Sequence, residues 1–433
     1  MIITMITAKL CALILRLTGR GATTLPGRVA LKMKYNILTR LSKGVRIICV
    51  TGTNGKTTTC ALLEHAFKSS GISYFINKSG ANMLSGVTTA FILNSDIFGR
   101  CRKEFAILEC DENSLPLISR YIDAEITVVT NVFRDQLDRY GEVHSTLGKI
   151  REGIKNMPKT TLILNADDPL TYSLKMTHGG SCVTFGIDAD VQTDGLSDNR
   201  YCPVCKTELQ YRSRTISQLG DFYCPLCSYR RSRPDFEISE ITKTGFLLNG
   251  KLFSTALGGL YNLYNVCAAA AVLKTLNKGR IKDLCTFSGA FGRMEKFELK
   301  NGSALLLLVK NPAGLTGCIR YISGIDSELC AAFALNDNDA DGRDVSWIWD
   351  SDFTPLKEKC KNVYTFGTRS LDMALRLKYD GIEAEVSEGE NYRKLIKLIK
   401  DNDGDFVVFS TYTAMMKMRH LFIDAFGGKE FWK

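Results

Sequence analysis

Residues 45–59 read Val-Arg-Ile-Ile-Cys-Val-Thr-Gly-Thr-Asn-Gly-Lys-Thr-Thr-Thr, an apolar run followed by a Gly-Lys-Thr turn and by residues that suit a helix. This order predicts a buried strand, a phosphate-binding loop and a helix N-terminus. Backbone N–H groups of the small residues can surround a polyphosphate, while Lys56 adds positive charge and a Thr hydroxyl suits Mg²⁺. Val50 stands where the general pattern has its first Gly, so the match is to the shorter Gly-Thr-Asn-Gly-Lys-Thr variant. A glycine turn that caps a helix is the alternative.

The overall composition is that of an ordinary globular protein, with 45% hydrophobic and 24% charged residues. A length of 433 residues predicts more than one domain. The 56 Lys and Arg exceed the 46 Asp and Glu, and the net charge of +10 suits nucleotides, sugar phosphates or an acidic membrane surface without choosing among them. Most of the 15 cysteines stand in apolar runs, which favours core residues in a reducing, cytoplasmic compartment.

The first 17 residues are apolar but are interrupted by Lys9 and Arg16 and are followed by Gly-Arg-Gly. We interpret them as a helix packed on the core in preference to a signal peptide or membrane anchor, and a weak interfacial role near a membrane remains open. Only about 45 residues precede the loop, so we expect no separate domain there.

Apolar strand candidates alternate with helical stretches after the loop. This alternation predicts an α/β fold with a mostly parallel sheet covered on both faces, whose ligands gather at the carboxyl ends of the strands. The candidates are Ile72–Ile76, Phe105–Cys110, Ile126–Thr130, Thr161–Asn165 and Cys182–Phe185.

Two strand ends carry polar residues that suit a site. Phe105–Cys110 runs into Asp111 and Glu112, so Glu109 and its neighbours are expected near the phosphate loop as oxygen ligands for a hard cation, with a solvated acidic turn as the alternative. Residues 131–142 are highly charged for a segment after a buried strand, which favours a site over a surface helix. The turn 166–169, Ala-Asp-Asp-Pro, suits either a contact to a nucleotide's base or ribose or a helix N-cap.

Cys202 and Cys205, and then Cys224 and Cys227, form two Cys-x-x-Cys pairs with 18 residues between them. This is zinc-ribbon spacing, and four thiolates leave no open position for water, so the predicted Zn²⁺ is structural. Tyr and Arg residues nearby also suit a nucleic-acid-binding ribbon, the main rival class of function. Against that reading, the ribbon interrupts an enzyme-like α/β domain, and no nucleic acid is expected.

The chain after the ribbon predicts an antiparallel extension over residues 236–255, an Ala-rich helix after Asn262 and Asn265, and then a second α/β domain. We place the boundary near Phe297, which gives domains 1–296, with the ribbon at about 198–234, and 297–433. Arg293 is a candidate phosphate contact at this hinge. Residues 336–353 concentrate acids and hold Trp347 and Trp349, which suggests a partner surface, although a structural loop fits the composition equally well.

Residues 52–58, Glu109, the 131–142 loop, the 165–169 turn, Asn262, Asn265 and Arg293 together resemble the central domain of the Mur ligase superfamily, and the similarity continues through the second domain. Three features resemble the branch that amidates lipid II. These are the expected lack of a UDP-sugar domain, the inserted Cys₄ ribbon and the motif Asp-Gly-x-Asp-x-Ser-Trp-x-Trp-Asp at residues 341–350.

The resemblance implies a ligase that uses ATP to join ammonia to the α-carboxylate of the D-glutamate in the lipid II stem peptide. It implies that the nucleotide is bound by Gly52, Thr53, Asn54, Gly55, Lys56, Thr57, Thr58, Asn262, Asn265 and Arg293. It assigns Thr57 and Glu109 to Mg²⁺, and it gives Lys56 and Glu109 catalytic roles.

The resemblance also implies a GatD-type glutamine amidotransferase subunit as the source of ammonia, working beside lipid II at the inner face of a bacterial membrane. The resemblance further implies that the ligase subunit supplies an acid that orients the partner's His. We predict Asp350 for this role, with Asp344 as the rival. Residues 135–138 read Asp-Gln-Leu-Asp and 260–262 read Leu-Tyr-Asn, which departs from common Mur patterns and leaves the Mg²⁺ ligands partly open. A Mur-type or folylpolyglutamate-type amino-acid ligase is the competing enzyme.

Overall fold

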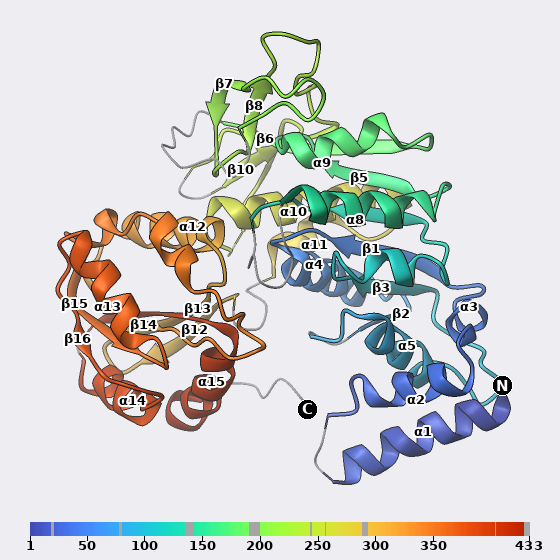
Figure 1. The fold of residues 1–433 in the computed structure, drawn as a ribbon, viewed down its shortest axis with the longest axis horizontal. Coiled ribbons are helices and arrows are strands. Elements are labelled where there is room, and N and C mark those ends of the chain that lie inside the picture. The colour runs from blue at the N-terminus through green and yellow to red at the C-terminus, as the bar shows by residue number, and fades with distance from the viewer. Residues whose placement is uncertain are drawn as a thin grey trace. The chain divides into compact units, whose positions relative to one another are not determined.

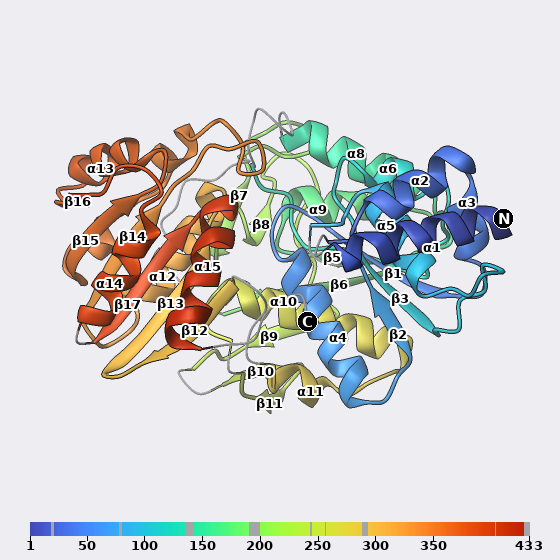
Figure 2. The same ribbon diagram turned by 90° about the horizontal axis from the view of Figure 1, so that it is seen from below.

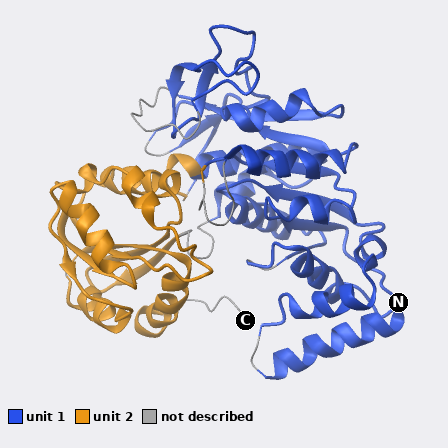
Figure 3. Ribbon diagram, in the orientation of Figure 1, with its two compact units in different colours: residues 1–133, 143–256, 262–287 blue, residues 134–142, 257–261, 288–433 orange. Residues whose placement is uncertain are grey.

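The computed structural model describes residues 1–18, 21–77, 80–134, 143–189, 200–242, 245–255, 257–287, 293–402 and 404–427, with only the backbone of Arg293. These residues form two compact units, coloured separately in Figure 3. Unit 1 comprises residues 1–133, 143–256 and 262–287, and unit 2 comprises 134–142, 257–261 and 288–433.

Unit 1 is built on a sheet in the order β11-β10-β9-β6-β5-β4-β1-β3-β2. All neighbouring pairs from β9 to β2 are parallel, whereas β9, β10 and β11 pair antiparallel. The six strands predicted before the ribbon, one leading into the phosphate loop and five after it, are therefore confirmed, as is the antiparallel extension after the ribbon. The strands are β1 (Arg46–Thr51), β2 (Tyr74–Ile76), β3 (Phe105–Glu109), β4 (Ile126–Val129), β5 (Thr161–Asn165), β6 (Cys182–Asp188), β9 (Phe236–Ser239), β10 (Phe246–Leu248) and β11 (Lys251–Phe253).

Helices cover both faces of this sheet, and Figure 2 shows α6 and α8 on one face with α4 and α11 on the other. A parallel sheet covered in this way buries both sides of each strand, which is why β1 and β3 are continuous apolar runs. The helices are α4 (Lys56–Ser69), α5 (Leu84–Leu93), α6 (Leu115–Ile118), α8 (Val143–Lys155), α9 (Pro169–Ser173), η1 (Leu174–Met176), α10 (Leu260–Leu276) and α11 (Ile281–Cys285).

The described residues before β1 form three helices, α1 (Ile2–Leu17), α2 (Leu25–Met33) and α3 (Ile37–Leu41). The predicted helix at the start of the chain is confirmed, and it packs on the core through Met5, Ala8 and Ala12. Among the described residues, no helix combines the length and the apolar character needed to cross a bilayer. All fifteen cysteines of the chain are free thiols.

The ribbon is a small hairpin of β7 (Gln210–Arg214) and β8 (Gly220–Tyr223), which lies in the chain between β6 and β9. Its own apolar cluster contains Leu209, Phe222 and Tyr229 together with Cys202 and Cys224. In Figure 1 the hairpin lies at the β6 end of unit 1.

Unit 2 contains a six-stranded sheet in the order β12-β13-β17-β14-β15-β16, parallel except for the antiparallel pair β12 and β13. Apolar residues of α12 and α13 pack on one face, and those of α14 and α15 pack on the other. The edge strand β12 is an element that the sequence pattern did not predict. The elements are β12 (Arg293–Leu299), β13 (Gly302–Leu308), α12 (Pro312–Ser323), β14 (Leu329–Ala334), η2 (Ser346–Asp350), η3 (Thr354–Leu356), β15 (Cys360–Phe366), α13 (Ser370–Tyr379), β16 (Glu385–Val386), α14 (Tyr392–Asp401), β17 (Asp405–Ser410) and α15 (Tyr412–Phe426).

Candidate nucleotide site and metal centre

The loop between β1 and α4 has the backbone shape that its glycines predict. Gly52 and Gly55 have φ values of +121° and +88°, a region that costs other residues strain. A Cβ at Gly55 would clash with the side-chain oxygen of Asn265, and one at Gly52 would clash with the hydroxyl of Thr130. The loop is therefore closely surrounded, and side chains on its glycines would fill the space around its backbone.

Polar residues at the end of β4 hold the loop in place. The Asn54 amide donates to Oδ1 of Asn131 at 2.9 Å, and the Asn131 side-chain amide donates back to the Asn54 carbonyl at 3.1 Å. The Thr130 hydroxyl donates to the same carbonyl at 2.7 Å. The Thr53 amide donates to the Asn131 carbonyl at 2.9 Å. These bonds preorganise the loop, because its turn is fixed before any ligand arrives.

Lys56 begins α4 and is buried at the base of the loop. Its Nζ lies 2.5 Å from the Gly52 carbonyl oxygen, 3.4 Å from that of Thr53 and 2.7 Å from Oε1 of Glu112. Burial lowers the pKa of the ammonium, but the charges of Glu112, Asp111 and Glu109 outweigh burial and raise it above the ordinary value. Lys56 therefore stays charged within a group of three carboxylates.

Glu109 ends β3, directly beside Val50 at the end of β1, so its carboxylate lies near the loop. Its backbone is fixed on both sides by Asn77, which donates to the Glu109 carbonyl at 2.9 Å and accepts from the Glu109 amide at 2.8 Å. Asn77 follows the edge strand β2 and was not singled out from the sequence, although a polar residue at a strand's carboxyl end was the usable signal.

The Ala-rich helix α10 brings Asn262 and Asn265 to the loop. Oδ1 of Asn265 accepts from the Thr59 hydroxyl at 3.4 Å, and its amide donates to Oδ1 of Asn262 at 3.3 Å. Thr58 is buried and Thr57 is half-buried in the first turn of α4. The predicted nucleotide residues of unit 1 thus converge on one place, where a helix N-terminus and backbone N–H groups favour an anion.

The turn 166–169 is a helix N-cap. Asp168 caps α9 by accepting from the Leu170 amide at 3.1 Å, and its other oxygen accepts from the Val132 amide at 2.7 Å. Burial raises the pKa of Asp168 to about 6 against these hydrogen bonds. The sequence allowed either a nucleotide contact or a helix N-cap at this turn, and the structure shows the N-cap.

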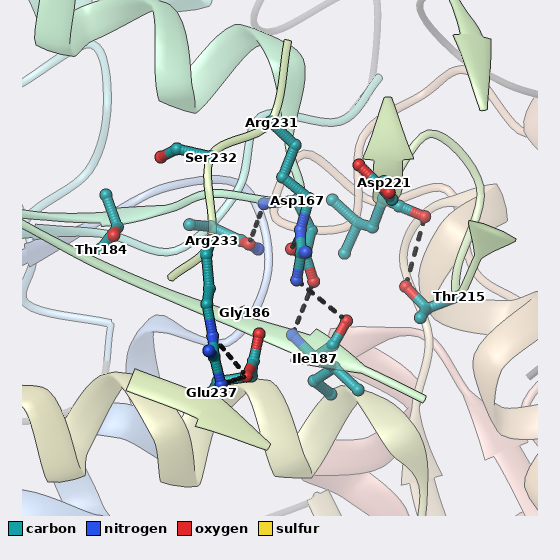
Figure 4. Close-up of polar contacts among 12 residues, drawn as sticks. Asp167, Thr184, Gly186, Ile187, Thr215, Asp221, Arg231, Ser232, Arg233 and Glu237 are labelled. Carbon is teal, nitrogen blue, oxygen red and sulfur yellow. Dashed lines mark hydrogen bonds and ion pairs between the residues drawn. The ribbon is translucent and has the colours of Figure 1, made fainter. Parts of the chain in front are cut away.

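Asp167 is fully buried and joins β5, β6, α10 and the segment after the ribbon. Its carboxylate accepts from Arg231 Nε at 2.6 Å, the Ile187 amide at 2.7 Å and the Tyr264 hydroxyl at 2.6 Å. Figure 4 shows Arg231 reaching Asp167 and Ile187. The Asp167 amide donates to Oδ1 of Asn165, and the side-chain amide nitrogen of Asn165 donates to the Thr130 carbonyl. A polar network thus connects the ribbon segment with the end of β4 that holds the loop.

The four predicted metal ligands come together. Cys202 and Cys227 have their sulfur atoms 3.7 Å apart, those of Cys205 and Cys224 are 3.4 Å apart, and all four lie within 4.8 Å of one another. Four sulfurs at tetrahedral corners about 2.3 Å from Zn²⁺ would be about 3.8 Å apart. The cluster therefore fits a closed tetrahedral ion.

The acidic loop of unit 2 divides into a buried part and an exposed part. Asp341 accepts from the amide and hydroxyl of Thr413 at the start of α15, while Asp344 accepts from the Ser346 amide in a local turn. Asp350 ends η2, is half-exposed and pairs with Arg134 of the same unit at 2.9 Å.

The two tryptophans of this loop have different roles. Trp347 packs in the core, which contradicts its predicted place on a partner surface. Trp349 is 45% exposed, with the Tyr379 ring 5.2 Å away. The partner-surface prediction thus stands for Trp349 alone. The short 3₁₀ turn accounts for this, because it does not alternate its side chains as a strand does.

Two predictions fall outside the described residues. The charged loop is described only through Arg134, so residues 135–138 and their comparison with the Mur pattern lie outside. The backbone of Arg293 opens β12, but its side chain is not described.

Comparisons with known proteins agree with this geometry. Residues 50–273 match the Mur ligase middle domain, and residues 308–415 match the MurT ligase C-terminal domain. A relative in Streptococcus pneumoniae, the MurT subunit of a glutamine-hydrolysing lipid II isoglutaminyl synthase, is 36% identical over 93% of this chain and 92% of its own length. The chain belongs to the MurT family of Mur ligases.

Solved structures show the same fold at lower identity to this MurT-family chain. A pseudomurein peptide ligase type C from Methanothermus fervidus has a TM-score of 0.70 and 21% identity, covering 90% of this chain and 80% of that one. MurF ligase from Thermotoga maritima in complex with ADP has a TM-score of 0.64 and 15% identity, covering 92% and 84%. The MurT-family chain is an ATP-dependent ligase with a Mur-ligase α/β fold.

Proposed function

We propose that this chain is the ligase subunit of a bacterial lipid II isoglutaminyl synthase in the cytoplasm, peripheral to the inner face of the membrane. It would convert the α-carboxylate of the D-glutamate in the lipid II stem peptide into the amide of D-isoglutamine during peptidoglycan synthesis. The observation that carries this proposal is the preorganised loop with Lys56 among carboxylates, in a chain of the MurT family. We further propose that the first domain, predicted as residues 1–296 with the ribbon, binds the nucleotide, and that the second domain includes all of β12 (Arg293–Leu299) and so begins a few residues before the predicted boundary at Phe297.

The chemistry explains why such a loop is needed. A carboxylate is a poor electrophile, so ATP would supply a phosphoryl group to form an acyl phosphate, from which ammonia would displace phosphate. Lys56 would hold the phosphates of ATP, and Thr57 and Glu109 would ligate Mg²⁺. Asn262, Asn265 and Arg293 would contact the nucleotide or act at the hinge. The residues present fit ATP, because the buried ammonium of Lys56 and the N-terminus of α4 lie at a loop whose turn Gly52 and Gly55 allow.

Ammonia would come from glutamine through a GatD-type amidotransferase partner in a heterodimer. Support comes from the surface of η2 and α13, where Trp349, Tyr379, Leu371 and Leu375 are exposed beside Asp350. Exposed aromatic side chains such as Trp349 and Tyr379 are typical of interface centres, and the two leucines lie on the same helix as Tyr379. Asp350, half-exposed at the end of η2, would orient the partner's His. Asp344 is the rival, and its carboxylate accepts from the Ser346 amide in a local turn, whereas that of Asp350 pairs with Arg134.

The Cys₄ cluster would hold a structural Zn²⁺, which ties Cys202 and Cys205 to Cys224 and Cys227 and stabilises the hairpin. All four sulfur atoms are needed for a tetrahedral set, so the ion would offer no position to substrate. If a Cys202→Ser variant still binds nucleic acid, the ribbon is not the nucleic-acid-binding element. If the native chain binds no nucleic acid at all, the rival function is excluded.

The first experiment measures ATP turnover on lipid II with ammonium or with free amino acids. The proposal predicts turnover with ammonium alone and a product one amide group richer. A requirement for an amino acid would overturn it in favour of the Mur-type or folylpolyglutamate-type ligase.

The second experiment tests the partner role in the co-purified complex. Asp350→Asn should abolish glutamine-driven amidation and leave ammonium-driven amidation unchanged, while the matched Asp344→Asn variant keeps both. Survival of both rates in Asp350→Asn would contradict the assignment. Loss of both in either variant would indicate a structural role.

A further inference from the structure

Helix α1 exposes its bulky aliphatic side chains to solvent. Ile3, Ile6, Leu10, Leu13 and Leu17 follow one another at spacings of three or four residues, so they share one face, and they are between 50% and 78% exposed. Ile2 and Ile14 beside this face are also about half exposed. We call this set the aliphatic face of α1.

The opposite face of α1 packs on the rest of unit 1, mostly through smaller side chains. Thr4, Met5, Ala8 and Ala12 are the buried positions of α1, which contacts α2 and α5. A surface helix of a globular protein usually has the reverse arrangement, with its large apolar residues toward the core. Figure 1 shows α1 as the outermost helix at its end of unit 1, beside α2. The aliphatic face is thus left for something outside unit 1.

The charge of the same region indicates what covers this face. Residues 1–45 contain eight Lys and Arg and no Asp or Glu, and so carry most of the net charge of +10. Arg16 lies on α1 itself, and the side chains of Arg28 and Lys32 on α2 are exposed. Asp96 lies near Lys9 and offsets part of this charge. An aliphatic surface accompanied by an excess of cations is complementary to a layer of anionic headgroups above hydrocarbon.

We propose that the aliphatic face of α1 binds the surface of an anionic lipid bilayer, with the helix lying in the plane of the interface. The 16 residues of α1 are fewer than the roughly 20 that a spanning helix needs, which suits an interfacial position. The inference goes beyond the proposed function. Only the use of membrane binding rests on that function, because a lipid-linked substrate lies in the same membrane.

A bilayer fits the face better than a second protein surface does. Protein interfaces place aromatic residues and Arg at their centre, whereas the aliphatic face consists of Ile and Leu. Insertion of such a face among acyl chains removes its aliphatic surface from water without a partner of matching shape. The Lys and Arg of residues 1–45 would add an attraction to anionic headgroups that salt weakens.

The test is sedimentation of the 433-residue chain with vesicles of phosphatidylglycerol and phosphatidylcholine in equal parts, and with phosphatidylcholine alone. We expect binding to the anionic vesicles that is at least about tenfold tighter than to the neutral ones and that weakens at high salt. Leu13→Gln combined with Leu17→Gln should weaken binding by about tenfold or more, because both side chains would leave the acyl region.

A matched pair on the other unit serves as control. Leu371 and Leu375 on α13 are also leucines four residues apart and more than half exposed. Their double change to Gln should leave vesicle binding intact but weaken co-purification with the amidotransferase. The α1 double variant should weaken vesicle binding and leave co-purification intact. Circular dichroism and nucleotide binding should be unchanged in both variants.

Three results would overturn the inference: no vesicle binding by the native chain, equal loss in both double variants, or concentration-dependent self-association that only the α1 variant loses. Since vesicle binding needs neither ATP nor lipid II, the result is independent of whether amidation is observed.

Discussion

Two buried ion pairs of unit 1 have nearly the same length but different surroundings. The N–O distance is 2.7 Å for Lys56 and Glu112 and 2.6 Å for Arg231 and Asp167. Asp167 is one carboxylate with three donors, of which only the guanidinium is charged. Lys56 is one ammonium with three carboxylates near it.

The difference separates a structural pair from a functional one. Around Asp167 every contact joins two elements, and the charge of the acid is balanced by that of Arg231. Around Lys56 three carboxylates act on one ammonium, and carboxylate oxygens are the ligands that Mg²⁺ prefers. We expect the ammonium to exchange Glu112 for a phosphate oxygen when a nucleotide binds. We therefore expect changes at the first pair to alter stability and changes at the second to alter activity.

The largest effect should come from breaking the structural pair. Arg231→Met leaves Asp167 buried without its cation, so we expect a loss of about 3–5 kcal/mol in the free energy of unfolding. Urea unfolding followed by far-ultraviolet circular dichroism measures it. Arg212→Met is the matched control on the same ribbon, because Arg212 pairs with Asp221 at 3.1 Å while 63% exposed, and should cost below about 1 kcal/mol. Equal losses of unfolding free energy in the two variants would show that the buried pair is no more important for stability than the exposed one.

The functional pair is tested by Lys56→Met. Without the ammonium, phosphoryl transfer should slow by about 10²–10³-fold. ATP turnover with lipid II and ammonium measures it, and Lys68→Met on the exposed end of the same helix should retain the native rate. A Lys56→Met enzyme that turns over ATP normally would show that the pair is structural after all.

Asp168, next to Asp167, is a buried carboxyl that pairs with no cation among the described residues, and it predicts a pH dependence of stability. Asp168 receives hydrogen bonds from neutral groups, and burial raises its pKa to about 6. The folded chain then binds the proton more tightly than the unfolded chain, so the contribution of Asp168 to the free energy of unfolding falls by up to about 3 kcal/mol as pH rises from about 4 to about 6. Unfolding measured across this range should show a smaller fall in Asp168→Asn. An identical pH profile would contradict the buried, proton-binding carboxyl.

The smallest effect is expected at Glu112. Glu112→Gln keeps a carbonyl for Lys56 but removes one negative charge, so ADP without metal should bind about tenfold more tightly because repulsion decreases. Calorimetric titration measures this, and Glu64→Gln on the outer part of α4 should not change it. Weaker binding in Glu112→Gln would mean that Glu112 positions Lys56 for the nucleotide.

The sequence predicted the elements of the site better than their connections. Hydrophobic runs identified β1 and β3, so Glu109 was expected beside the loop, where it lies. The Cys-x-x-Cys spacing identified four sulfurs that converge. Asn77 was missed because its effect depends on which strand lies beside β3, and Trp347 was misplaced because a 3₁₀ turn has no sequence pattern as plain as a strand.

What the sequence by itself determined is local: the strand, the glycine-dependent turn, the helix that starts at Lys56 and the pairs of cysteines. Each follows from side-chain pattern over a few residues. Only the tertiary structure decided that Lys56 meets Glu112, that Arg231 meets Asp167 and that α1 turns its aliphatic face outward. The partners in these pairs are 56 and 64 residues apart in the chain. The outward face depends on which side of α1 the core accepts, and chain folding alone fixes that choice.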